Sequence, residues 1–166
     1  FRKNLCISNL IYQYPGAIVP ALNNISLSIG KGETVGLIGE SGSGKSTIID
    51  IILGLLVPEA GFVEVDDQDI QLDIRQWQDQ IGYVPQSIYL TDDTFRRNIA
   101  FGLPDDQIDN VAVKYAIQAA QLDDFVSSLP DGMETLVGER GIRISGGQRQ
   151  RIGIARALYH DPDVLV

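Results

Sequence analysis

Cysteine and histidine are nearly absent from this sequence of 166 residues, which holds one of each, Cys6 and His160. A single cysteine excludes a disulfide within the chain, and one cysteine with one histidine cannot form a Cys- or His-based metal cluster. Cys6 lies in an apolar, strand-like run, and His160 lies in Tyr159-His160-Asp161-Pro162, a string typical of a helix end. We therefore interpret Cys6 as a small buried residue and His160 as a residue without a metal role.

Basic residues and long apolar runs are also scarce. The chain carries 13 Lys and Arg residues against 22 Asp and Glu residues, a formal net charge of −9. Binding to nucleic acid depends on clustered Lys and Arg residues that contact the phosphate backbone, so we expect no nucleic acid partner. No apolar run approaches the roughly 18 to 20 residues that a membrane-spanning helix needs. A hydrophobic content of 44% suits one domain with its own core.

Apolar periodicity divides the chain into a β-rich first part and a more helical second part. Alternating or short apolar runs predict strands at 5–10, 25–29, 34–38, 62–66 and 81–84, the third of them covered on both faces. Residues 46–56 would be apolar on nearly every side of a helix, which predicts a buried helix that Pro58 stops. Polar-faced helical stretches such as 110–122 fill 87–143, and a last helix over 147–159 leads into the apolar residues 164–166.

A glycine-rich segment separates the predicted strand at 34–38 from the helix at 46–56. It reads Gly39-Glu40-Ser41-Gly42-Ser43-Gly44-Lys45-Ser46-Thr47 and matches G-x-x-x-x-G-K-[ST] in its required strand–helix context. The glycines let N–H groups converge on phosphate oxygens, and the helix directs the positive end of its dipole at the same anion. Lys45 would reach the β- and γ-phosphates, Ser46 would ligate Mg²⁺, and Thr47 is a further phosphate donor. The structural alternative is a Gly/Ser-rich turn capped by a helix.

A second motif lies near the end of the chain and reads Ile144-Ser145-Gly146-Gly147-Gln148-Arg149-Gln150-Arg151. On its own, Ser-Gly-Gly-Gln is also a helix cap. Downstream of the phosphate loop in one chain, it resembles the signature sequence of the ATP-binding cassette (ABC) family. Ile144 replaces the usual Leu, which is a volume-conserving departure.

The resemblance implies an α/β fold. Its parts are a P-loop NTPase core, with a mostly parallel sheet flanked by helices, an N-terminal antiparallel β subdomain and a helical insertion. We expect residues 1–166 to be one ABC nucleotide-binding domain, excised from a longer protein and incomplete at its C-terminus. The β subdomain and P-loop core would occupy 1–86, the helical subdomain 87–144, and the signature helix with the start of the next core strand 145–166.

In the family, two such domains meet head to tail, and the signature of one faces the γ-phosphate held by the loop of the other. Ser145 offers a hydroxyl and Gly146 and Gly147 offer N–H groups at a helix start, which suits an anion. The resemblance therefore implies ATP and Mg²⁺ as cofactors and a second nucleotide-binding domain, in a homodimer, as partner. It also implies a transmembrane domain and a place at the cytoplasmic face of the cell membrane.

Two further residues match the family in order along the chain. Tyr14 resembles the aromatic residue that stacks on adenine, with Tyr12 as the competing candidate and a core tyrosine as the alternative. Gln86 resembles the glutamine that approaches Mg²⁺ and the attacking water, with a surface glutamine as the alternative. The resemblance thus assigns Lys45 and Gln86 to catalysis and Ser46 and Gln86 to the metal. It assigns the nucleotide to Tyr14, Gly39, Glu40, Ser41, Gly42, Ser43, Gly44, Lys45, Ser46, Thr47, Gln86, Ser145, Gly146, Gly147 and Gln148.

Two segments resemble exporter-type members of the family. Val137-Gly138-Glu139-Arg140-Gly141 looks like the loop that touches the intracellular extensions of the membrane domains, and residues 87–102 resemble the segment that receives a coupling helix. An exposed ion pair of Glu139 and Arg140 is the structural alternative. In its overall sequence the chain is similar to exporters and flippases of lipids, lipid-linked sugars or polysaccharides.

The dipeptide Asp-Glu, which in the family ends a core strand and supplies a Mg²⁺-holding Asp and the general base, occurs nowhere in the chain. Residues 163–166 look like the start of that strand. We therefore expect the parent protein to hydrolyse ATP and this chain at best to bind nucleotide weakly. Two other classes stay open, a soluble cassette ATPase acting on nucleic acid or ribosomes and a P-loop kinase or GTPase, although no guanine-specific Asn-Lys-x-Asp string is present.

Overall fold

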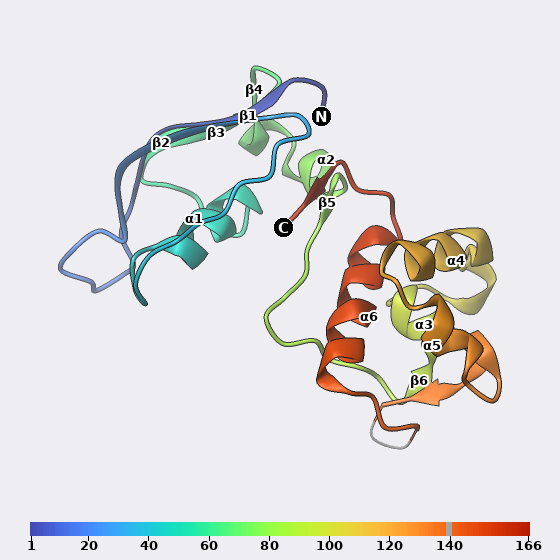
Figure 1. The fold of residues 1–166 in the computed structure, drawn as a ribbon. Helices are drawn as coiled ribbons and strands as arrows, with labels where there is room; N and C mark the ends of the chain where they lie inside the picture. The colour runs from blue at the N-terminus through green and yellow to red at the C-terminus, as the bar shows by residue number, and fades with distance from the viewer. Residues whose placement is uncertain (139–140) are drawn as a thin grey trace. The chain divides into compact units, whose positions relative to one another are not determined.

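Two units, Phe1–Gln80 and Ile81–Val166, make up the computed structural model of the chain, which describes residues 1–138 and 141–166 (Figure 1). Each unit has its own set of paired strands and packed helices. Within the described residues, we find no helix with both the length and the apolar character that crossing a membrane requires.

The first unit is built on a four-stranded antiparallel sheet in the order β2-β1-β3-β4 (Figure 1). The central strands β1 (Asn4–Tyr12) and β3 (Ala60–Val65) pair with each other, and the sheet is completed by β2 (Leu22–Gly30) and β4 (Gln68–Asp69). Alternation along β1 buries Leu5, Ile7, Leu10 and Tyr12 on one face. Cys6, one step out of that register, is therefore only half-buried, which corrects the expectation of full burial.

Helix α1 (Lys45–Ile52) follows the phosphate loop and ends earlier than the predicted residue 56. Gly54 takes a φ of 70°, and the N–H groups of Leu55 and Leu56 bond back to the carbonyl oxygen of Asp50 at 2.8 and 3.2 Å. This left-handed termination closes the helix before Pro58 can act.

The last segment of the first unit, residues 70–78, is hydrogen-bonded to the end of α1. A 3₁₀ turn, η1 (Ile70–Leu72), leads into α2 (Ile74–Gln78). The indole N–H of the buried Trp77 donates to the carbonyl oxygen of Ile52 at 2.7 Å. This bond satisfies a carbonyl that the helix end leaves without an intrahelical donor.

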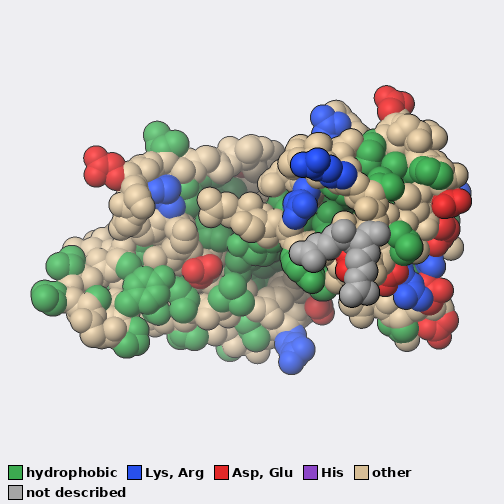
Figure 2. All heavy atoms as spheres, turned by 90° about the horizontal axis from the view of Figure 1, so that it is seen from below, with side chains coloured by type: hydrophobic (Ala, Val, Ile, Leu, Met, Phe, Trp, Pro, Cys, Tyr) green, Lys and Arg blue, Asp and Glu red, His purple; other side chains and the backbone are tan. Residues whose placement is uncertain are grey.

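The strand predicted over residues 34–38 does not form. Val35, Leu37 and Ile38 are exposed, and Figure 2 shows apolar side chains on the drawn surface of the first unit. A strand exists through ladder hydrogen bonds to a neighbour, and none of the described residues pairs with this run. The apolar pattern alone could not supply that partner.

The second unit is mostly helical, as predicted for 87–143. Its helices are α3 (Phe95–Ile99), α4 (Asn110–Ala119), α5 (Asp123–Ser127) and α6 (Gly146–Leu158), with 3₁₀ turns η2 (Asp105–Gln107) and η3 (Gly132–Glu134). They enclose one apolar core that includes Phe95, Ile99, Val113, Leu122 and Ile152.

Two short strand pairs complete the second unit. β5 (Ile81–Gly82) pairs in parallel with β8 (Val164–Leu165), which confirms the strand beginning near residue 164 and a short strand at 81. β6 (Asp93–Thr94) pairs antiparallel with β7 (Leu136–Val137), a contact that the periodicity did not predict. Parallel pairing, an antiparallel N-terminal sheet and a helical region together agree with the expected α/β class.

Candidate functional site

The phosphate loop turns into α1 at Gly44. This residue has a φ of 87°, in the left-handed region, and a Cβ there would lie 2.6 Å from the carbonyl oxygen of Ala21. Only glycine meets both demands without strain. The first N–H groups of α1 have no carbonyl acceptor within the helix, and they face the loop together with the positive end of the helix dipole.

Lys45 holds its ammonium group inside the loop. Its Nζ donates to the carbonyl oxygens of Gly39 at 2.9 Å and Glu40 at 2.6 Å, and lies 3.3 Å from the Oγ of Ser43. Positive charge from this side chain and from the start of α1 therefore converges on one place. Loop residues 40–43 are exposed, so an anion can reach them. The arrangement fits a chain of phosphates.

The structure separates the two tyrosines proposed for the base. Tyr12 is 9% exposed and belongs to the core, whereas Tyr14 is 42% exposed and touches Tyr12 edge to face. The Tyr14 hydroxyl lies 3.2 Å from the Oγ1 of Thr47, in the first turn of α1. An accessible ring held beside the phosphate loop favours Tyr14 as the stacking residue. The Thr47 hydroxyl thus shares a hydrogen bond with Tyr14.

Ser46 is the second residue of α1 and is exposed. No set of three or more His, Cys, Asp or Glu side chains that could hold a metal occurs in the described part of the chain. Mg²⁺ needs no such set when phosphate oxygens and waters fill most of its octahedral shell. Ser46 therefore suits a Mg²⁺ ion that arrives with a nucleotide, and its role stays a prediction.

The signature motif forms the start of α6. A capping box closes this end: the N–H of Gln148 donates to Ser145 Oγ at 3.2 Å, and the N–H of Ser145 donates to Gln148 Oε1 at 2.9 Å. The Ser145 hydroxyl accepts in this pair and keeps its own proton for donation. Gly146 and Gly147 are exposed, and a Cβ added to either would meet no neighbouring heavy atom within 4 Å. Gln148 thus shapes a helix start that is open to an anion.

Gln86 is exposed and lies in the irregular segment after β5. It belongs to the second unit, while the phosphate loop belongs to the first. Its predicted approach to Mg²⁺ stays a prediction. Within the loop predicted to face membrane extensions, Val137 ends β7 and Gly138 follows it with a φ of 103°. Glu139 and Arg140, which were also singled out in this loop, lie outside the described residues.

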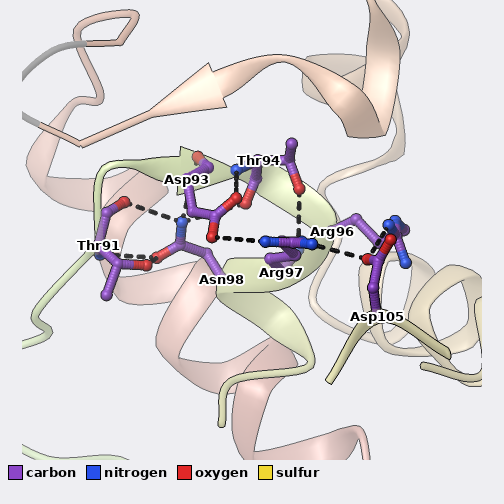
Figure 3. Close-up of polar contacts among 7 residues, drawn as sticks. All are labelled: Thr91, Asp93, Thr94, Arg96, Arg97, Asn98 and Asp105. Carbon is purple, nitrogen blue, oxygen red and sulfur yellow. Dashed lines mark hydrogen bonds and ion pairs between the residues drawn. The ribbon is translucent and has the colours of Figure 1, made fainter. Parts of the chain in front are cut away.

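The two exporter-like segments lie side by side in the second unit, because β6 belongs to one and β7 enters the other. Arg96 donates to Asp105, and Arg97 donates to Asp105 at 3.1 Å and to Asp93 at 3.3 Å (Figure 3). Arg96 also donates to Glu134 at 2.9 Å. Hydrogen bonds from Arg97 and Arg96 lower the pKa of the Asp105 carboxyl below its ordinary value. A charge network therefore links α3 to η2 and η3.

Sequence reasoning missed the residue at the centre of this region. Asn98 is fully buried, and its side chain donates to the carbonyl oxygens of Thr91 at 3.0 Å and Thr94 at 3.1 Å while accepting from the Thr91 N–H at 2.9 Å (Figure 3). An asparagine in a predicted helix resembles a surface residue, so no periodic signal could have found it. The charge network likewise joins residues too far apart in sequence for a pattern.

Comparisons with known proteins agree with the family that the two motifs resemble. The family model described as ABC transporter matches residues 22–166. The chain is 41% identical to an ATP-dependent lipid A-core flippase of Cupriavidus metallidurans, over 99% of this chain and 28% of that protein. It is also 41% identical to the ABC transporter ATM1 of Toxoplasma gondii, over 92% of this chain and 13% of that protein.

A solved structure agrees as well. The structure of a bacterial Atm1-family ABC exporter with ATP bound matches with a TM-score of 0.84 and 35% identity, over 99% of this chain and 28% of that one. The chain thus spans less than a third of the length of these relatives. On its phosphate loop, its capped signature helix and these matches, the chain belongs to the ABC transporter family.

Proposed function

We propose that this chain is the ATP-binding domain of an ABC exporter, in which ATP binding and hydrolysis drive movement of a substrate across a membrane. The observation that carries the proposal is the pairing, in one chain, of a Lys45-bearing phosphate loop at the start of α1 with a capped, exposed signature at the start of α6. Each is an anion site built on a helix N-terminus.

ATP with Mg²⁺ is the proposed ligand of the loop. The triphosphate would lie against the N–H groups of residues 42–47 and the Lys45 ammonium, Ser46 would take a Mg²⁺ position, and the adenine would stack on Tyr14. Bound Mg²⁺ neutralises phosphate charge for attack by water. Lys45 and Gln86 are the proposed catalytic residues, with Lys45 stabilising charge and Gln86 orienting the attacking water.

A second copy of the domain is the proposed partner of the signature. Ser145, Gly146 and Gly147 present a hydroxyl and N–H groups, and no acidic residue occupies the first turn of α6. Such an end suits a phosphate, which the loop of a partner domain would supply in a head-to-tail dimer. Closing of the dimer around ATP would favour one of two states of the transporter.

A membrane domain is the other proposed partner, and the cytoplasmic face of a cell membrane is the proposed location. Support comes from the flippase and exporter relatives and from the exporter-like segments joined by β6 and β7. For the domain division we propose a β subdomain with P-loop core over 1–86, a helical subdomain over 87–144 and the signature helix over 145–166. A lipid or lipid-linked saccharide is the proposed substrate, by similarity to the lipid A-core flippases.

The nucleotide half of the proposal is tested by titrating the chain with Mg-ATP in a calorimeter. We expect binding that Lys45→Ala abolishes. Tyr14→Ala should weaken it by about 5- to 100-fold, because stacking of a base on an aromatic ring contributes about 1–3 kcal/mol. Tyr14→Phe keeps the ring and should change the affinity by less than about threefold. Equal affinity of the wild type and Lys45→Ala would contradict the site.

The same proteins test turnover. The sequence holds no Asp-Glu pair to supply the general base, so we propose that the 166-residue chain binds ATP without steady hydrolysis and that the full transporter hydrolyses it. Phosphate release by the chain should equal that of its Lys45→Ala variant. Release by the wild-type chain that Lys45→Ala removes would refute this part while leaving the binding site intact.

A further inference from the structure

Arg156, in the last turn of α6, holds three points of the segment that follows Gln86. Its Nε donates to the carbonyl oxygen of Asn98 at 2.9 Å, and its Nη2 donates to that of Tyr89 at 3.1 Å. Its guanidinium carbon lies 4.5 Å from the centre of the Phe101 ring, over the ring face. One side chain therefore connects α6 to both ends of the stretch from Tyr89 to Phe101.

The stretch held by Arg156 is itself folded around Asn98. The buried Asn98 amide donates to the carbonyl oxygens of Thr91 and Thr94 (Figure 3). The carbonyl oxygen of the same Asn98 accepts from Arg156. The hydrogen bonds thus run without a break from α6 through Asn98 to β6. Buried polar groups that are fully paired in this way rigidify the elements they join.

Packing reinforces this connection along α6. Gly153 lies against the side chain of Ile88, so closely that a Cβ on it would come within 2.3 Å of Ile88 Cδ1. The helix starts at the signature and reaches Arg156 in its last turn. Gly146 and Arg156 thus lie on one continuous helix, which is a rigid element of the kind that can carry coupling between two sites.

We propose that Arg156 is a positioning residue that makes the signature helix and the segment Tyr89–Phe101 move as one body, passing closure at the nucleotide to the membrane domain. The inference rests on the proposed function and adds to it the side chain that transmits the motion. Arginine suits this role because its planar fork donates from separate nitrogens to separate acceptors, whereas lysine carries one point charge. Burial lowers the pKa of Arg156, and the group stays charged because an arginine begins so far above neutrality.

Hydrogen–deuterium exchange on the chain tests the connection itself. Arg156→Met keeps an apolar stem and removes every donor, and Arg156→Lys keeps the charge. Arg151→Lys is the matched control, because Arg151 lies on the same helix and donates to a single carbonyl, that of Gln121. We expect amides of residues 89–99 to exchange about tenfold faster in Arg156→Met, less so in Arg156→Lys, and unchanged in Arg151→Lys. Unchanged exchange in Arg156→Met would overturn the proposal.

Spin-label distances in the full transporter test the transmission. In a transporter from which the native cysteines, Cys6 among them, have been replaced by serine, one label pair on Ser127→Cys of two domains reports nucleotide closure, and a second pair reports opening of the membrane domain. With Mg-ATP, Arg156→Met should close at its nucleotide sites with an ATP KM within about twofold of wild type. The fraction of open membrane domains should fall at least about fivefold, and Arg156→Lys should recover part of it.

The outcomes separate the two proposals. If the wild type closes and opens normally and Arg156→Met does the same, the positioning role is wrong and the proposed function stands. If ATP changes neither distance in the wild type, the exporter function fails, and the inference fails with it. If Arg156→Met does not fold, Arg156→Lys and its exchange rates carry the test.

Discussion

At the scale of single residues, Asp105 accepts hydrogen bonds from two guanidinium groups, Arg96 and Arg97. Arg96 is largely covered, with 13% of its side chain exposed, while the Asp105 side chain is 52% exposed. Isolated exposed ion pairs contribute little to stability. Here one carboxylate joins two cations that also bind Glu134 and Asp93, so its loss should release several contacts together.

Asp105→Asn should make the stability of the second unit less dependent on acid. Since the pKa of Asp105 in the folded chain lies below its ordinary value of 3.8, the carboxylate stabilises the fold above that pH. The stabilisation is lost as pH falls through the folded pKa. We expect melting points of wild type and Asp105→Asn to differ at neutral pH and to converge as the pH falls below 3.8 and through the lowered pKa of Asp105 in the folded chain.

Circular dichroism melts across this pH range provide the measurement. Asp106→Asn is the control, since Asp106 is the exposed neighbour in the same 3₁₀ turn and its substitution removes the same charge. A constant difference between wild type and Asp105→Asn at every pH would show that the effect of the substitution does not come from the negative charge of Asp105.

At the scale of elements, α6 depends on Gly153 for its close approach to Ile88. An alanine usually stabilises a helix relative to glycine by up to about 1 kcal/mol. Gly153→Ala should instead lower the free energy of unfolding by about 1–3 kcal/mol, because the new methyl group overpacks a buried contact. Gly147→Ala, at an open position of the same helix, should leave it unchanged or raise it.

Chemical denaturation of the wild type, Gly153→Ala, Ile88→Val and the double variant, which together form a double-mutant cycle, checks this prediction. Ile88→Val removes one methyl group from the contact, so the double variant Gly153→Ala/Ile88→Val should recover part of the loss. Additive effects of the two substitutions would mean that Gly153 and Ile88 do not contact each other as described.

At the scale of the whole chain, the single tryptophan, Trp77, reports on the first unit. It is 3% exposed, so unfolding of that unit should shift its fluorescence. Mg-ATP at about 100 times its dissociation constant should raise the free energy of unfolding followed at Trp77 by about 2.7 kcal/mol, because a ligand that binds only the folded state stabilises it.

Lys45→Ala should abolish this stabilisation, while Lys3→Ala should keep it. Lys3 is an exposed lysine of the same unit, paired at the surface with Asp67. Denaturant titrations with and without Mg-ATP give the comparison. Equal stabilisation of the wild type and the Lys45→Ala variant would place the nucleotide elsewhere.

Local chemistry made much of the fold and site predictable from sequence. Alternation along β1, β2 and β3 was readable because side chains on a strand alternate between two faces. The loop glycines, Lys45 and the Ser145 cap make their contacts with residues close in sequence, so the sequence motif is enough to predict their geometry. The resemblance assigned the base to Tyr14 with Tyr12 as the competing candidate, and the burial of Tyr12 in the structure favours the same choice.

Other features were decided only by tertiary structure. The run at 34–38 is as apolar as a core strand, yet it forms no ladder with a described residue, because pairing depends on a partner and not on propensity. The joining of β6 to β7, and of Arg156 to Asn98 and Tyr89, unites residues distant in sequence. Such contacts leave no periodic trace in the sequence. The sequence by itself therefore determined the anion-binding helix starts, and only the packing of distant segments decided how α6 is connected to Tyr89–Phe101.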